Sequence, residues 1–196
     1  MEKIIEIIKP FEEALLVIEK IINMMKKLYY VRPTKKTIND FAIKTNNGYA
    51  YSKSEKSENG LYGIYTIKNI SGSKKFDRSD IVKNNMLEIG EVITGLSGTI
   101  GTAGLVDSDG YVSNQRTLAI TSKYAAQISF SINMYKEKSD TISTGAVQKN
   151  ITADNILSLP FEPIYDTNFE KLYLSLLIIR KNILNVRDYM IELLVK

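Results

Sequence analysis

The N-terminal stretch, residues 1–29, reads MEKIIEIIKPFEEALLVIEKIINMMKKLY and repeats apolar side chains at the spacing of a coiled-coil helix. The intervals alternate between four and three residues, which places one apolar row on one helix face. The row consists of Ile4, Ile8, Phe11, Leu15, Ile18, Ile22, Met25 and Tyr29. Pro10 interrupts the pattern, because an interior proline removes a hydrogen bond; either the helix kinks there or it begins near Pro10. We expect a long helix that buries this row.

The C-terminal stretch shows the same periodicity. Its apolar row consists of Leu172, Leu176, Ile179, Ile183, Val186, Met190 and Leu193. The preceding Pro160-Phe-Glu-Pro163 cannot be helical, and Thr167 or Asn168 is a suitable N-cap. Two such rows in one chain predict that the two helices pair antiparallel, because both attach to the same middle region. Pairing between two copies of the chain satisfies the pattern equally well.

The middle of the chain, residues 38–164, has a different pattern, with short β-like runs between turn signals such as Asn46-Asn47-Gly48. The expected strands are residues 61–67, 90–94, 104–106, 111–112, 116–121 and 127–132, with short helices near 37–44 and 152–157. We therefore predict an α+β chain, in which one globular domain is flanked by two long helices that form an antiparallel coiled coil. The predicted units are residues 1–30, 31–165 and 166–196.

Composition excludes several kinds of chemistry. The chain has no Cys and no His, so it has no thiolate nucleophile, no imidazole base and no Cys- or His-ligated metal site. The carboxylate pairs Asp107 with Asp109 and Glu88 with Glu91 are typical of turns and surfaces. We expect no catalytic residues, no metal and no cofactor. The glutamates of the N-terminal stretch argue against a signal peptide or membrane span, so we expect a cytoplasmic protein without membrane association.

Basic side chains are concentrated in one short strip, although the net charge is only +4. The strip contains Lys68, Lys74, Lys75, Arg78 and Lys83, against Asp77 and Asp80. Such a strip attracts phosphate or acidic partners. The alternative is a solvated loop that keeps the protein soluble.

Asn114-Gln115-Arg116 is a second candidate for contact with nucleic acid. Asn and Gln can pair with adenine and Arg with guanine in the major groove. The alternative is ordinary polarity at a turn, with Arg116 paired to Asp107 or Asp109; alternation along a strand would also turn Gln115 to the opposite face. The glycine series Gly95, Gly98, Gly101 and Gly104 fits neither a dinucleotide nor a P-loop motif. We interpret it as a tight connection between strands, with phosphate contact as the alternative.

Five segments, in this order, resemble the DNA-specificity (S) subunits of type I restriction-modification systems. They are residues 63–72, 88–101, 113–116, 145–152 and 159–163, followed immediately by the C-terminal helix. The resemblance covers about residues 38–194. The family's Glu-Gln at the start of that helix is replaced by Tyr165-Asp-Thr-Asn168, and the family's second target-recognition domain has no counterpart here.

The resemblance implies half of a specificity subunit, with one target-recognition domain that recognises double-stranded DNA and is not itself an enzyme. The half is a natural half-length protein, a truncated gene product or the second half of a longer one. It implies methyltransferase (M) subunits and a restriction (R) subunit as partners, which would bring any S-adenosylmethionine or ATP, and a homodimer or a second half subunit to complete recognition. From charge and hydrogen-bonding capacity, we expect Lys68, Lys74, Lys75 and Arg78 to contact phosphates, and Asn114, Gln115 and Arg116 to read bases. The alternative function is a coiled-coil interaction or antirestriction module that binds proteins and not DNA.

Overall fold

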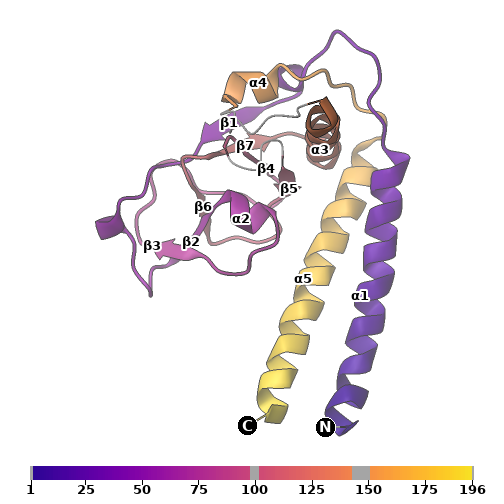
Figure 1. Cartoon of the computed structure of the whole chain (residues 1–196), viewed down its shortest axis with the longest axis vertical. Coiled ribbons are helices and arrows are strands. Elements are labelled where there is room, and N and C mark those ends of the chain that lie inside the picture. Colours follow the sequence, from indigo (N-terminus) through magenta and orange to yellow (C-terminus); the bar gives the residue numbers. More distant parts are fainter. Residues whose placement is uncertain (1, 98–101, 143–150, 196) are drawn as a thin grey trace.

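The computed structural model describes residues 2–97, 102–142 and 151–195. Two long helices, α1 (Glu2–Leu28) and α5 (Thr167–Val195), run antiparallel along each other, and a globular domain packs beside α5 (Figure 1). The start of α1 and the end of α5 lie together at the end of the pair that points away from the domain. The predicted α+β architecture, with one domain flanked by an antiparallel coiled coil, is confirmed.

The apolar row of α1 is buried from Leu15 onward, whereas Ile8 and Phe11 are half-buried and the side chain of Ile4 lies outside the described part of the structure. Leu15, Ile18, Ile22, Met25 and Tyr29 are each at most 8% exposed. The helix runs without interruption from Glu2 through Pro10, so the alternative start near Pro10 is wrong. Burial among these groups raises the pKa of Tyr29 to about 12.

The row predicted for α5 is only half correct. Leu176, Ile183 and Met190 are buried or half-buried, but the four other members are 48–53% exposed. The exposed members are Leu172, Ile179, Val186 and Leu193. The residues of α5 in the contact row instead directly follow Leu172, Ile179 and Val186 in the sequence. They are Tyr173, Arg180 and Arg187.

Two arginines occupy this row because their stems cover apolar surface while their guanidinium groups reach carboxylates. Arg180 pairs with Glu19 of α1. Arg187 donates to Glu12 of α1 at 2.8 Å. A reading of apolar residues alone therefore selects the wrong members of the row.

The domain contains two small sheets. The four-stranded sheet has the order β1-β7-β4-β5 and is antiparallel throughout, whereas in the three-stranded sheet, β3-β2-β6, β2 pairs antiparallel with β3 and parallel with β6. The strands are β1 (Lys44–Asn47), β2 (Tyr62–Tyr65), β3 (Asp77–Ser79), β4 (Val92–Gly95), β5 (Ala103–Leu105), β6 (Tyr111–Ser113) and β7 (Thr117–Thr121). Since β6 and β7 belong to different sheets, the three residues between them join the two sheets.

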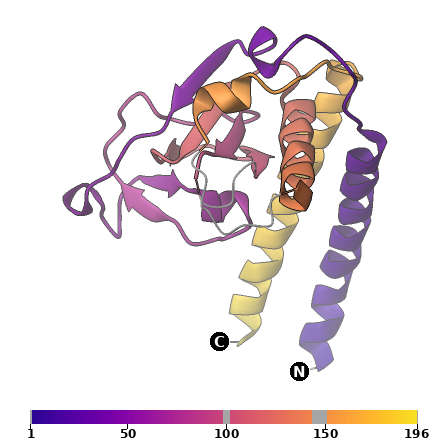
Figure 2. The ribbon, with the colours of Figure 1, turned by 45° about the horizontal axis from the view of Figure 1, so that its top comes forward.

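The strand predicted at residues 127–132 is wrong, because this segment belongs to helix α3 (Ala125–Ile142). All residues from 125 to 132 are buried, since α3 lies between the sheets and the helix pair (Figure 2). A helix buried on every side needs no apolar stripe, and its alternating Ser and apolar residues resemble a strand. Ser129 satisfies its hydroxyl by donating to the Ala126 carbonyl at 2.7 Å.

The short helices also differ in part from the prediction. Residues 153–157 form α4 (Ala153–Leu157) as predicted, but near residues 37–44 the helix is only a 3₁₀ turn, Ile38–Asp40. Asn46 and Asn47 belong to β1 and not to a turn. Helix α2 (Ile67–Ile70) and the 3₁₀ turn Lys53–Glu55 were not predicted. Within the described ranges, no helix combines the length and apolarity needed to cross a bilayer.

Candidate nucleic-acid interface

A polar hollow of about 750 Å³ lies on the domain between two segments that are distant in sequence. One segment is the basic loop, residues 68–75, which begins within α2 and continues past its end; the other is the connecting turn, residues 114–116, between the two sheets. The lining residues are Tyr51, Lys56, Thr66, Ile67, Lys68, Asn69, Ser73, Lys75, Asp77, Ser97, Asn114, Gln115 and Arg116. Five of the seven residues predicted to contact DNA therefore line one hollow: Lys68, Lys75, Asn114, Gln115 and Arg116.

The backbone of the connecting turn is fixed on both sides. The Asn114 amide donates to the Tyr65 carbonyl at 3.0 Å, and the Gln115 amide donates to the Tyr49 carbonyl at 3.0 Å. Behind the turn, Gly48 approaches so closely that a Cβ there would lie 1.9 Å from the Asn114 carbonyl oxygen. The turn is therefore held by backbone contacts, and its side chains need not be used to keep it in place.

The side chains of Gln115 and Arg116 are exposed at the hollow. Among the described residues, neither side chain has a hydrogen-bond or ion-pair partner within the chain. The pairing of Arg116 with Asp107 or Asp109 is not found, because Asp107 accepts from Lys181 of α5 at 2.9 Å. Asn114 uses its side-chain oxygen to accept from the Arg116 amide at 3.1 Å. The expectation that Gln115 faces away, as in a strand, is also wrong, because Gln115 and Arg116 form a turn and all three residues line the hollow.

Lys74 and Arg78, the other two predicted contacts, do not line the hollow. Lys74 pairs with Asp188 of α5 at 2.9 Å, so it joins the basic loop to the coiled coil. Arg78 donates to the carbonyls of Gly60 and Leu61 at 2.6 and 2.9 Å, and thereby fixes the turn before β2.

Charge within the hollow is mainly positive. Asp77 is the one carboxylate among the described lining residues, and it pairs with Lys56 at 2.7 Å. Lys68, Lys75 and Arg116 are left as basic groups beside neutral amides and hydroxyls, a composition suited to phosphate oxygens and base edges. Lys56 and Thr66 were missed by the sequence reasoning, since nothing in their local pattern indicates that they converge on this hollow.

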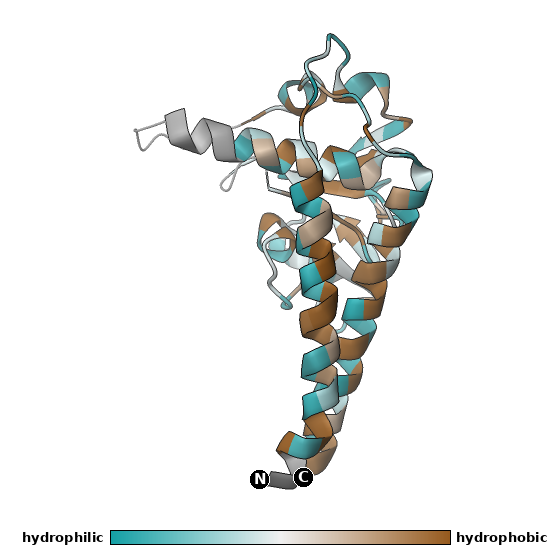
Figure 3. Ribbon diagram, turned by 90° about the vertical axis from the view of Figure 1, so that its right-hand side faces the viewer, coloured by the Kyte–Doolittle hydropathy of each residue, from teal (hydrophilic) through white to brown (hydrophobic). Residues whose placement is uncertain are grey.

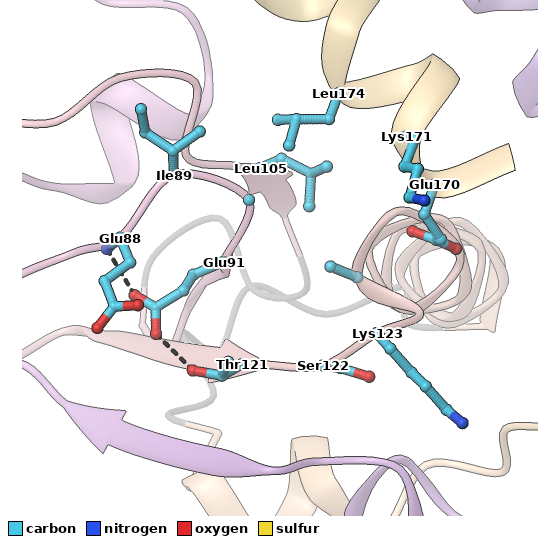
Figure 4. Close-up of a pocket in the computed structure, with 12 residues that line it drawn as sticks. Glu88, Ile89, Glu91, Leu105, Thr121, Ser122, Lys123, Glu170, Lys171 and Leu174 are labelled. Carbon is cyan, nitrogen blue, oxygen red and sulfur yellow. Dashed lines mark hydrogen bonds between the residues drawn. The ribbon is translucent and has the colours of Figure 1, made fainter. Parts of the chain in front are cut away.

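A smaller hollow of about 230 Å³ lies between the four-stranded sheet and the first turns of α5, and Figure 4 shows the residues that line it. Glu91 is only 6% exposed, so its assignment to the surface was wrong. Its carboxylate accepts from the Thr121 hydroxyl at 2.5 Å and from the Glu88 amide at 2.9 Å. These bonds give Glu91 a structural role at the turn before β4. The described residues contain no group of three carboxylates arranged to hold a metal.

Glu170 of α5, at the edge of this smaller hollow, connects α5 to α3. Its carboxylate accepts from the amides of Ala126 and Gln127 at the start of α3, and from the Gln127 side chain at 2.9 Å. Burial raises the pKa of Glu170, and the three hydrogen bonds only partly oppose this effect. Gln127 also accepts from the amides of Ile164 and Tyr165 at 2.8 and 2.9 Å, which fixes the chain just before α5.

No protein-family model matches the sequence, and no curated protein matches it. Among solved structures, the HsdS subunit from Thermoanaerobacter tengcongensis matches with a TM-score of 0.53 and 11% identity, over 97% of this chain and 49% of that chain. The S subunit of a type I restriction-modification system from M. genitalium has a TM-score of 0.46 and 16% identity, over 65% of this chain and 33% of that one. A chain from a structural study of complex assembly and conformational transition in the type I R-M system has a TM-score of 0.49 and 12% identity, over 98% of this chain and 51% of that one.

The chain thus has the fold of type I restriction-modification S subunits, and it spans about half the length of the Thermoanaerobacter tengcongensis subunit. Of the five segments that resemble S subunits, residues 145–152 lie largely outside the described residues.

Proposed function

We propose that this chain is one recognition half of a type I restriction-modification specificity subunit, and that it reads double-stranded DNA with the hollow between the basic loop and the connecting turn. Residues 31–165 would form the target-recognition domain. The observation that carries the proposal is the convergence of Lys68, Lys75 and residues 114–116 on one surface. The fold shared with HsdS subunits supports it independently.

The two sides of the hollow suit different parts of a duplex. Lys68 and Lys75 are point charges on flexible stems, which suit phosphate oxygens but carry no sequence information. Arg116 and Gln115 present forked donors and an amide on a rigid turn, which suit the edges of guanine and adenine. A rigid turn lowers the entropy cost of ordering these side chains on DNA.

We further propose that the chain catalyses nothing alone and acts with M and R subunits, which would carry out methylation and cleavage. The absence of Cys and His from the sequence supports this division, because these residues supply the usual nucleophiles and bases near neutral pH.

An exposed apolar face on the coiled coil supports a protein partner. On α1 the face contains Val17, Met24 and Leu28, at 54–58% exposed; on α5 it contains Leu172, Ile179, Val186 and Leu193, at 48–53%. On both helices most of these residues precede a contact-row residue by one position. Because the two helices are antiparallel, a step of one residue back from the contact row turns in opposite senses on the two helices when both are viewed from the same end. The two exposed rows therefore lie on the same side of the helix pair. Figure 3 shows that apolar residues recur along the length of both helices.

We propose a second copy of this chain as the occupant of this face. The face extends along both helices at heptad spacing, as helix pairs that associate into a four-helix bundle require. Two copies would also supply the two halves of a subunit such as that of Thermoanaerobacter tengcongensis, of which this chain covers 49%.

The alternative function is an interaction or antirestriction module that binds proteins and not DNA, and the same apolar face favours it. A salt titration separates the two functions. We expect labelled duplex DNA to bind the purified chain, with an association constant that falls steeply between about 50 and 200 mM salt. Absence of binding at low salt, both alone and with an M subunit, would favour the alternative.

A further inference from the structure

The basic loop is organised around one buried polar side chain, that of Asn69, which is 7% exposed. Its oxygen accepts from the Thr66 amide at 2.9 Å and from the Thr66 hydroxyl at 2.7 Å. Its amide group donates to the Ser73 carbonyl at 3.0 Å and to the Lys75 carbonyl at 2.8 Å. All four hydrogen-bonding positions of the Asn69 side chain are thereby used.

The two bonds to Thr66 belong to the cap of α2, and the chain contains the same arrangement a second time. In α4 the oxygen of Asn155 accepts from the Thr152 amide at 3.0 Å and from the Thr152 hydroxyl at 2.8 Å. Asn155 is exposed, and among the described residues its side-chain amide group has no hydrogen-bond partner. Capping therefore accounts for the oxygen of Asn69 but not for the use of its amide group.

The two remaining bonds determine the path of the basic loop. They tie Ser73 and Lys75 back to α2 across Gly72, whose φ of +104° turns the chain. The Ser73 amide donates to the Lys68 carbonyl at 2.9 Å, which closes the loop at its base. Lys68 and Lys75 consequently line the same hollow.

We propose that Asn69 is a positioning residue for DNA binding, and that it holds Lys75 beside Lys68, which already lies within α2, so that both can reach phosphates. This inference rests on the proposed function of the hollow. Asn69 touches the loop backbone and acts through Lys75. Without its amide group, the loop no longer holds Lys75 at the hollow, and the phosphate contact of Lys75 is lost.

The test compares Asn69→Ala, Asn155→Ala, Lys75→Ala and the double variant Asn69→Ala/Lys75→Ala in salt titrations of duplex binding. We expect Asn69→Ala and Lys75→Ala each to reduce the slope of log K against log salt by about 0.9, the contribution of one phosphate contact. The slope of the double variant should fall little further than the slope of either single variant, because both substitutions remove the same phosphate contact. Asn155→Ala, which removes only a cap, should keep the wild-type slope.

A measurement without DNA tests the same geometry. Trypsin should cut after Lys74 and Lys75 faster in Asn69→Ala than in the wild type or Asn155→Ala, because the loop opens more often. If Asn69→Ala does not fold, Asn69→Ser replaces it, since one hydroxyl can accept from Thr66 but cannot donate to both carbonyls.

The inference is overturned if the Asn69 variant keeps the wild-type slope and cleavage rate, or if its effect adds fully to that of Lys75→Ala. A wild-type chain that binds no DNA while the Asn69 variant alone exposes the loop to trypsin would instead reject the proposed function and leave the loop geometry intact.

Discussion

Two neighbouring lysines of the basic loop have different surroundings. Lys75 lines the hollow, whereas Lys74 is paired with Asp188 of α5. Their charge and their position in sequence are equivalent, so the sequence alone predicts equal roles. The difference arises because α5, more than a hundred residues later, passes beside the loop.

Replacing these lysines one at a time tests the difference. Lys75→Ala should weaken binding to all duplexes alike and flatten the salt slope by about one unit. Lys74→Ala is the matched control and should change the slope less, because its ammonium group must leave Asp188 to reach a phosphate. Fluorescence anisotropy over a range of salt concentrations measures both, and equal slopes for the two variants would contradict the assignment.

Arg116 should contribute to sequence preference and not to general affinity. If it grips a guanine, Arg116→Ala should cost about 1–3 kcal/mol on the preferred duplex and relax preference at one base pair. Competition assays with single-base-pair variants of the preferred duplex measure this. A uniform loss on every duplex would show that Arg116 contacts only phosphate.

Glu170 makes stability depend on pH. Because burial raises its pKa in the folded state above the ordinary value of 4.5, the folded chain holds this proton more tightly than the unfolded chain. This group therefore adds stability as pH falls from neutrality through the raised pKa, and that gain is lost as pH rises again. Glu170→Gln cannot ionise, so its free energy of unfolding should depend less on pH than that of the wild type. Urea unfolding at several pH values measures this difference.

Glu170→Ala is the harsher variant, and it should lower the free energy of unfolding by about 1–3 kcal/mol, because buried donors at the start of α3 lose their acceptor. Equal pH profiles for the wild type and Glu170→Gln would contradict the raised pKa.

At the level of elements, periodicity predicts helices better than it predicts their contacts. The α1 row was correct from Leu15 to Tyr29, because the buried residues there are all apolar. On α5 the row was half correct, because Arg180 and Arg187 take contact positions that an apolar pattern cannot identify. Helix α3 was missed because burial on all sides removes the stripe on which the prediction depends. Residue chemistry identified five of the residues that line the hollow. The convergence of its two segments was not predicted, because it depends on the pairing of strands.

Adjacent leucines on α1 provide a matched test of the coiled coil. Leu15 is 8% exposed and Leu16 is 56% exposed, so Leu15→Asp buries an unpaired charge and Leu16→Asp does not. Leu15→Asp should cost about 3 kcal/mol or more, which lowers Tm by roughly 6–12 °C for a chain of this size. Leu16→Asp should stay within about 0.5 kcal/mol of the wild type. Equal melting of both variants would show that the row is not buried.

At the level of the whole molecule, the two faces of the helix pair have different roles. Residues that follow the α5 contact row, Lys181 and Asp188, bond to the domain, whereas those that precede the row form the exposed apolar face. The domain and a partner can therefore occupy the pair at the same time. A helix of about 27 residues spans about 40 Å, more than the 34–36 Å of one duplex turn. Two domains at opposite ends would then read half-sites of a symmetric, interrupted target.

Light scattering tests the second copy. The mass measured in solution should be twice the 22.2 kDa of one chain. The double variant Ile179→Lys/Val186→Lys should be a monomer that keeps its fold. Asn185→Lys adds one such charge at an exposed polar position of α5 and should leave the dimer intact. A wild-type monomer would reject the second copy, and binding of an M subunit to this face would then identify the other occupant.

Selection of duplexes from a random-sequence library, followed by sequencing, tests most directly whether this chain reads DNA. The chain, alone or with an M subunit, should enrich a short motif, and Arg116→Ala should enrich the same motif with one position relaxed. Retention of the library without enrichment of any motif would mean that the hollow does not read sequence, and it would contradict the account.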